Sequence, residues 1–178
     1  MKGDIAEAKL FNPDFIIANM HWGLEYERIP SREQRELADW LMRQGVDLVI
    51  GSHPHVVQPM ELRRGKEGVP DRLVVYSLGN FISNMSREHT DGGVMVKVVL
   101  GRKGLRRYIA SAQYSLIYSS RYKNEQGKED IRVVPAASWS GKNQNSSFSV
   151  DSALIKYVNN TRLFLKGNNK EVEEYIFE

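Results

Sequence analysis

The chain has 178 residues, with 25 Lys and Arg against 22 Asp and Glu, a net charge of +3, and no cysteine. This length allows a domain with a substantial core, and the absence of cysteine excludes disulfides and thiolate metal sites. Basic and acidic residues are interleaved, so the sequence offers no positive stripe of the kind that binds nucleic acid. No segment reaches the roughly 18 apolar residues of a transmembrane helix.

The N-terminal part of the chain predicts a strand–helix–strand unit. A short helix is expected over residues 4–10, and the apolar run 14–20 is typical of a strand buried on both faces. Residues 31–45 have the strongest helix pattern, because a capping box opens the segment and a glycine closes it. The apolar run 46–51 predicts a second strand, and this order and spacing imply that the two strands are parallel.

Three of the four histidines follow these two strands: His21 follows the first, and His53 and His55 follow the second. The carboxyl ends of parallel strands meet at the same edge of a sheet, so we expect the three imidazoles on one rim. Pro54 favours an extended conformation for His53. In an extended segment the side chains of His53 and His55 would point to the same side.

From the residues alone, two interpretations of these histidines stay open. The simpler one is a set of side chains that satisfy hydrogen bonds in polar loops. The other is a site for Zn, Mn or Fe, because neutral imidazoles with open coordination positions suit such ions. A hydrolase with two metals also needs carboxylates, and the nearest acids, Glu25 and Glu61, are not in diagnostic positions. The sequence therefore predicts half of a metal site.

The rest of the chain predicts mostly antiparallel strands and then helices, which makes the fold class α/β with α+β character. Alternating apolar residues and turn signals indicate strands over residues 60–64, 71–79, 92–101, 105–120 and 131–136. The third and fourth of these strands are expected to form a hairpin. After a polar stretch over 138–149, we expect an amphipathic helix over 151–165 and a short helix over 169–177.

Four motifs, in this order, resemble one known family. They are HWGLEY at residues 21–26, PSREQ at 30–34, GSHPHV at 51–56 and SLGNF at 77–81. Together they resemble the bacterial capsule synthesis family of the poly-γ-glutamate type, which is related to the calcineurin-like metallophosphoesterases. The resemblance implies a partial metallophosphatase αββα sandwich, with a βαβ unit followed by mostly antiparallel strands and C-terminal helices.

The resemblance also implies a division of the chain. Residues 1–137 would form the C-terminal half of the capsule synthesis domain. Residues 138–150 would be a linker-like stretch, and residues 151–178 would be a C-terminal helical segment.

The same resemblance implies a role for individual residues. His21 corresponds to the lone metal-ligand histidine of the superfamily, and His53 and His55 correspond to its histidine pair, each serving one of two adjacent divalent ions. Glu25 and Asn80 lie in family motifs, so we expect them among the catalytic or supporting residues of the rim. For Glu25 a structural salt bridge stays open, and for Asn80 a turn that closes a strand.

The chain departs from the family in what precedes these motifs. The superfamily's aspartate motifs and Asn-His pair supply the bridging carboxylate and the group that polarises the leaving group, and this sequence has no counterpart of them. The chain begins where the family's second half begins, which predicts a missing N-terminal half or a partner chain. A sheet without its neighbouring strands also has an open edge, which favours a homo-oligomer.

The resemblance implies a role in making a capsule of the poly-γ-glutamate type. The expected activity is metal-dependent hydrolysis at a phosphoesterase-like site that is incomplete in this chain. The expected partner is an envelope polymer or its precursor, and the expected location is the cell envelope, although the first residues lack the apolar core of a signal peptide. The alternatives are a non-catalytic scaffold of a polymer assembly complex and a structural domain whose histidines only make hydrogen bonds.

Overall fold

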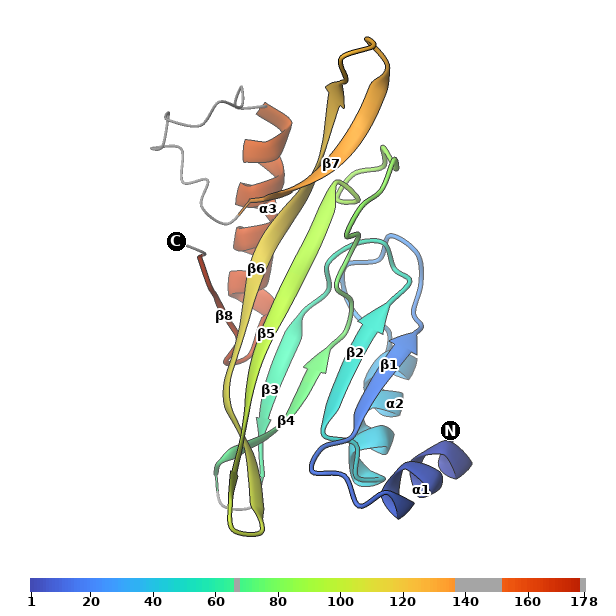
Figure 1. The fold of residues 1–178 in the computed structure, drawn as a ribbon, viewed down its shortest axis with the longest axis vertical. Coiled ribbons are helices and arrows are strands. Elements are labelled where there is room, and N and C mark those ends of the chain that lie inside the picture. The colour runs from blue at the N-terminus through green and yellow to red at the C-terminus, as the bar shows by residue number, and fades with distance from the viewer. Residues whose placement is uncertain (66–67, 137–151, 177–178) are drawn as a thin grey trace.

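Two β-sheets packed face to face form the frame of the protein in the computed structural model, which describes residues 1–65, 68–136 and 152–176 (Figure 1). In chain order the elements are α1 (Lys2–Leu10), β1 (Ile17–His21), α2 (Arg32–Arg43), β2 (Leu48–Ser52), β3 (Met60–Arg64), β4 (Pro70–Val75), β5 (Gly92–Lys103), β6 (Arg106–Lys123), β7 (Glu129–Pro135), α3 (Ser152–Asn168) and β8 (Glu173–Glu174). This mixture of helices and sheets confirms the predicted α/β class and is consistent with a partial sandwich. None of the described helices combines the length and apolarity needed to cross a membrane.

The first sheet contains the predicted βαβ unit. Strands β1 and β2 pair in parallel, with Ile17 opposite Leu48 and His21 opposite Ser52, and α2 connects them. Strand β4 pairs in parallel with the other side of β2, and β3 pairs antiparallel with β4, which gives the order β1-β2-β4-β3. The carboxyl ends of β1, β2 and β4 therefore lie at the same edge of the sheet (Figure 1).

Helix α2 covers one face of this sheet. The Ser31 hydroxyl accepts a hydrogen bond from the Gln34 backbone N–H at 3.2 Å, and the Gln34 side chain accepts one from the Ser31 N–H at 2.9 Å. This capping box satisfies backbone donors that the first turn of a helix leaves free. Ala38 and Leu41 are buried on the inner side of the helix. They form one apolar cluster with Val46, Val49, Val74 and Tyr76.

The second sheet is an antiparallel meander in the order β5-β6-β7, and the short β8 pairs in parallel with β6. The pairing of β5 with β6 runs from Gly92 opposite Tyr118 to Lys103 opposite Arg106, which confirms the predicted hairpin. The hairpin end is tied to the first sheet, because Arg102 forms an ion pair with Asp14 at 2.8 Å just before β1.

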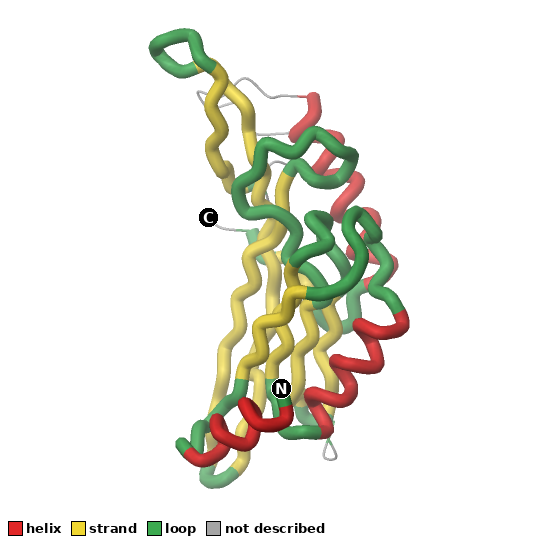
Figure 2. The backbone as a smooth tube through the Cα atoms, turned by 90° about the vertical axis from the view of Figure 1, so that its right-hand side faces the viewer, coloured by secondary structure: helices red, strands yellow, loops and turns green. Residues whose placement is uncertain are grey.

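The main core lies between the two sheets. Alternate residues of β5 and β6, such as Val94 and Leu116, belong to one apolar cluster with Leu73 and Val75 of the first sheet. Helix α3 closes this cluster with Leu154, Tyr157, Val158 and Leu165. Figure 2 shows α2 and α3 on the same side of the strands, with α3 above α2. The C-terminal helix thus shares the core that supports the sheets.

Two predictions about these elements are wrong, and one lies outside the described residues. Strand β1 is not buried on both faces: Ala18 and Met20 pack against the cluster beneath α2, whereas the alternate residues on the other face are exposed. The helix predicted over 169–177 does not form, since Lys170 donates its backbone N–H to Met60 and the next residues enter β8. The polar stretch predicted over 138–149 lies outside the described residues.

A buried carboxylate on β3 ties the C-terminal segment to the first sheet. The Glu61 side chain is 6% exposed and forms ion pairs with Arg63 at 2.8 Å, Lys170 at 3.1 Å and Arg35 at 3.6 Å. Burial by itself raises the pKa of Glu61, but the hydrogen bonds from Arg63 and Lys170 together outweigh burial and hold this pKa below its ordinary value. Glu61 therefore has a structural role and is not part of the histidine group.

We expect Glu61→Gln to lower the free energy of unfolding at pH 7 by about 2 kcal/mol, less than for a fully buried pair because its partners are partly exposed. Because the pKa of Glu61 is lowered in the folded state, its contribution is present above the unfolded pKa of about 4.3 and is lost as the pH falls through the folded value. Urea unfolding at pH 7 and pH 3 measures both effects.

The control for this prediction is Glu36→Gln, which removes an ion pair with Arg32 on the surface of α2, where the Glu36 side chain is 62% exposed. This control should change stability by less than about 0.5 kcal/mol at either pH. A difference between Glu61→Gln and the wild type that stays constant from pH 7 to pH 3 would contradict the ion-pair origin of the stabilisation.

Candidate metal centre

The ends of two neighbouring strands bring three histidines to one rim. His21 is the last residue of β1, and His53 follows β2 directly. The ring centroids of His21 and His53 lie 4.4 Å apart, and those of His53 and His55 lie 6.1 Å apart. The rim predicted from the parallel topology is therefore present, and it contains three adjacent imidazoles.

The carboxylate of Glu25 lies close to two of these histidines. Glu25, His53 and His55 each offer one ligand atom, and these atoms all lie within 4.8 Å of one another. The ligand atoms of a tetrahedral ion bound at about 2.1 Å lie about 3.4 Å from one another. Small rotations of the three side chains would bring their ligand atoms to this separation. Two imidazole nitrogens and a carboxylate oxygen are a donor set that fits Zn, Mn or Fe. His21 lies outside this set and packs against the ring of His53.

The loops that carry these side chains have a strained backbone. Tyr26, His53 and His55 have φ angles of 68°, 97° and 60°, in the left-handed region that non-glycine residues rarely adopt. The extended conformation predicted for His53 is therefore wrong, although the two rings do come together. The Tyr26 N–H donates a hydrogen bond across the rim to the Pro54 carbonyl at 2.8 Å. Contacts of this kind override the preference of a residue before proline for an extended backbone. Such strain, about 1–3 kcal/mol for each residue, gathers at functional sites.

Asn80 fixes the orientation of His55. The side chain of Asn80 is buried, and its Oδ1 lies 3.0 Å from Nδ1 of His55. The amide Nδ2 of Asn80 donates to the Thr90 carbonyl at 3.0 Å, so Oδ1 faces His55 as an acceptor. Nδ1 of His55 must then carry the proton, which leaves the lone pair of Nε2 free to bind a metal. Asn80 acts on the site as a positioning residue.

A buried indole fastens the three strand ends to one another. Nε1 of Trp22, the residue after β1, donates to the Tyr76 carbonyl after β4 at 2.8 Å. The hydrogen bond passes over Gly51 of β2, where an added Cβ would lie 2.0 Å from the Tyr76 oxygen and 2.4 Å from the Trp22 nitrogen. Only glycine permits this approach. The hydrogen bond between Trp22 and Tyr76 therefore fixes the positions from which the loops after the strands start.

Two buried glutamines hold the loop that carries Glu25 and Tyr26. Nε2 of Gln34 donates to Oε1 of Gln58 at 2.8 Å, and Nε2 of Gln58 donates to the Glu27 carbonyl at 2.8 Å. The sequence patterns did not predict this role for Gln58. Its signal was a lone amide within an otherwise apolar stretch, which a buried polar partner would explain.

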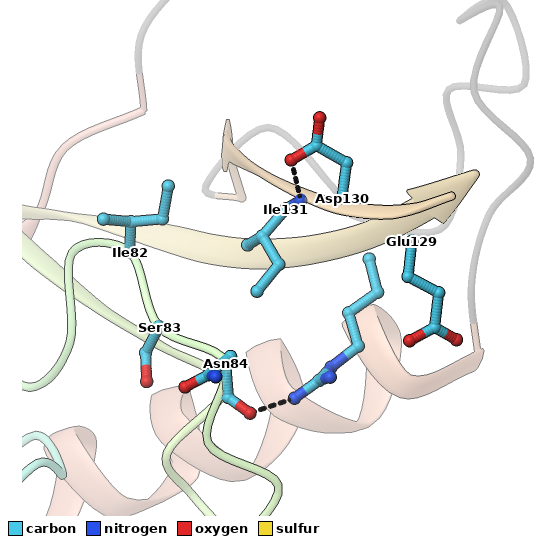
Figure 3. A pocket seen from close by; sticks show the side chains of 7 residues that line it. Ile82, Ser83, Asn84, Glu129, Asp130 and Ile131 are labelled. Atoms are coloured by element: carbon cyan, nitrogen blue, oxygen red, sulfur yellow. Dashed lines mark hydrogen bonds between the residues drawn. The ribbon is translucent and has the colours of Figure 1, made fainter. Parts of the chain in front are cut away.

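The remaining histidine and a surface pocket beside the β6–β7 turn do not join the site. Burial, together with the charge of Arg28, lowers the pKa of His89, and His89 lies outside the group of candidate ligands. Figure 3 shows a pocket in which the Asp130 carboxylate points away from the loop, while the Asn84 carbonyl accepts a hydrogen bond from Arg121. Its polar groups do not converge on a common point, so it does not form a candidate site. The pocket measures about 640 Å³ and is lined by Ile82, Ser83, Asn84, Arg121, Glu129, Asp130 and Ile131.

The match to known proteins covers the part of the chain that contains this rim. Residues 1–85, which include every candidate ligand and Asn80, match the family described as "Bacterial capsule synthesis protein PGA_cap". Through this segment the chain is similar to the bacterial capsule synthesis family.

Two curated relatives are similar to the chain. The PGA biosynthesis protein CapA of Bacillus subtilis (strain 168) is 35% identical over 104 residues, which cover 58% of this chain and 26% of the relative. The Capsule biosynthesis protein CapA of Bacillus anthracis is 35% identical over 98 residues, which cover 55% of this chain and 22% of the relative. The matched part thus spans about a quarter of the length of these relatives.

We expect Asn80→Ala to weaken the binding of Zn²⁺ or Mn²⁺ about 10- to 100-fold, because His55 loses the acceptor that fixes its tautomer. Asn84→Ala is the matched control on the same loop, since only the backbone carbonyl of Asn84 is bonded to Arg121. Calorimetric titration of each variant with the metal measures the difference. Equal affinities for both variants would show that Asn80 does not position His55.

We expect Gln58→Leu to lower the free energy of unfolding by about 1–3 kcal/mol, because the Gln34 amide and the Glu27 carbonyl would lose their buried partner. The control is Gln126→Leu in the exposed β6–β7 turn, where we expect a change within about 0.5 kcal/mol. Urea unfolding measures both, and a Gln58→Leu variant as stable as the control would exclude the proposed anchoring of the loop.

Proposed function

We propose that the intact protein is a metal-dependent hydrolase of the phosphoesterase type that acts in capsule synthesis, and that this rim supplies part of its metal site. The observation that carries the proposal is the meeting of Glu25, His53 and His55 within 4.8 Å at the ends of two parallel strands. We include His21 as a further ligand, because its ring lies against His53. A second divalent ion in the intact protein would use it.

The chemistry of the site follows from its residues. A bound divalent metal would polarise a substrate oxygen and lower the pKa of a bound water. Asn80 accepts a hydrogen bond from Nδ1 of His55, which leaves Nε2 of the neutral ring available as a ligand. Glu25 contributes the negative charge that offsets part of the charge of a cation, and its exposed position on the rim leaves it open to solvent and substrate.

We propose that the rest of the site comes from a part of the protein that this chain does not span, or from a partner chain. The described group holds one carboxylate, whereas a site for two metals needs a carboxylate that bridges them. Strand β1 has a free edge within the described sheet, and Ile17 on it is 52% exposed. Such an edge accepts another strand, either from that missing part or from a second copy in a homo-oligomer.

The substrate and location are proposed from the similarity. The relative from Bacillus subtilis is named a PGA biosynthesis protein and the relative from Bacillus anthracis a capsule biosynthesis protein. These names support poly-γ-glutamate or a similar envelope polymer, or its precursor, as the partner, and the cell envelope as the location.

A second candidate is a scaffold that binds the polymer or its assembly complex without catalysis. The single carboxylate of the described group favours it, because one carboxylate and two imidazoles can bind an ion without forming a complete hydrolytic centre. Metal content and activity of the intact protein separate the two candidates.

We expect the intact protein with Mn²⁺ to hydrolyse a chromogenic phosphodiester. The double variant His53→Ala, His55→Ala should lower the rate of hydrolysis at least about 100-fold and should lose the bound metal, because two ligands are removed. His89→Ala is the control and should leave both unchanged, since His89 lies outside the group. Elemental analysis and initial rates are the measurements.

The two candidates give different results in this experiment. Bound metal that disappears in the double variant, without hydrolysis by the wild type, would reject the hydrolase and leave the scaffold. Metal content that the double variant does not change would reject the metal site itself.

A further inference from the structure

An exposed arginine stacks on an aromatic ring that also contacts a candidate metal ligand. The guanidinium carbon of Arg87 lies 4.0 Å from the centre of the Tyr26 ring. The same ring is stacked with the imidazole of His55, at 6.2 Å between centroids and 28° between planes. A single aromatic side chain therefore connects the cation to one of the metal-binding histidines.

The backbone of Arg87 is connected to the same histidine by a second route. Thr90, which is fully buried, donates both its N–H and its hydroxyl to the Arg87 carbonyl, at 3.1 Å and 2.6 Å. The Thr90 carbonyl accepts from the amide of Asn80, whose oxygen holds His55. Both ends of Arg87 are thus fixed relative to the rim, although its side chain lies at the surface.

No carboxylate of the described residues forms an ion pair with Arg87. Its neighbour Glu88 lies 3.9 Å from the ammonium group of Lys156. Other arginines of the protein are paired, such as Arg63 with Glu61 and Arg162 with Glu174. Stacking on a ring fixes the plane of a guanidinium without using the N–H donors at its edge. Arg87 is therefore oriented while its donors stay available.

We propose that Arg87 binds an oxyanion group of the substrate next to the metal centre. A guanidinium edge matches the two oxygens of a phosphate or a carboxylate and forms paired charge-assisted hydrogen bonds with them. The assignment of the adjacent histidines and Glu25 as a metal centre rests on the proposed function. The contact between Arg87 and an anion does not require a metal. Arg87 is thus a residue that determines specificity for anionic substrates.

The test uses the described chain as purified, with and without Zn²⁺, and two probes that separate the sources of the anion. Inorganic phosphate represents a phosphoester, and a γ-linked glutamate trimer represents a polymer carboxylate. We expect Arg87→Gln to weaken the binding of the recognised probe about tenfold or more. Arg87→Lys should weaken it less, because lysine keeps the positive charge but lacks the paired N–H donors of the guanidinium. Calorimetric titration measures the affinities.

The matched control is Arg43→Gln in the last turn of α2, which removes the same charge at the end of the helix far from the rim. This control should bind both probes like the wild type, and the Zn²⁺ content of Arg87→Gln should equal that of the wild type. The probe whose binding is lost in Arg87→Gln identifies the anion, phosphate or carboxylate, that the site recognises.

Two results would overturn the inference: Arg87→Gln that binds both probes as tightly as the wild type, or a wild type that binds neither. A chain that fails to bind Zn²⁺ but still binds a probe through Arg87 would count against the proposed metal site and would support the anion contact. The two proposals therefore fail separately.

Discussion

The hydrogen bond from the Trp22 indole to the Tyr76 carbonyl is the contact on which the geometry of the rim depends. It joins the residue after β1 to the residue after β4 and crosses Gly51 near the end of β2. The donor is buried, so no water replaces this bond if it breaks, and a lost buried bond leaves an unsatisfied carbonyl. The strand ends are thus fixed in relation to one another before their loops begin.

Loops that start from fixed points must reach each other in few residues, which explains the strain in them. His53 and His55 adopt left-handed conformations although neither is glycine, and Tyr26 does the same on the facing loop. Their combined cost of several kcal/mol is tolerated because the sheets, α2 and α3 share large apolar clusters beneath the rim. A rigid base with strained loops on top is an arrangement that keeps ligands in place before a metal or substrate arrives.

The sequence predicted what periodicity and topology determine and missed what long-range contacts determine. The βαβ unit and the meeting of His21 with His53 follow from short apolar runs around one capped helix. The conformation of His53 could not be read from Pro54, because a hydrogen bond from another loop overrides the preference of a residue before proline. The segment after α3 has helical periodicity, yet pairing with β3 and β6 keeps it extended.

The charges of the rim limit what it can bind. Its histidines are neutral ligands when they hold a metal, so a divalent ion with Glu25 and Arg87 leaves a net positive site. Excess positive charge in a site that already orients a guanidinium favours an anionic ligand over a neutral one. Thr90 and Asn80 link the loop of Arg87 to His55, so the proposed recognition of an anion and the orientation of His55 would depend on the same buried hydrogen bonds. A change in that network would therefore alter metal affinity and anion affinity together, whereas a change at the guanidinium alone would alter only the second.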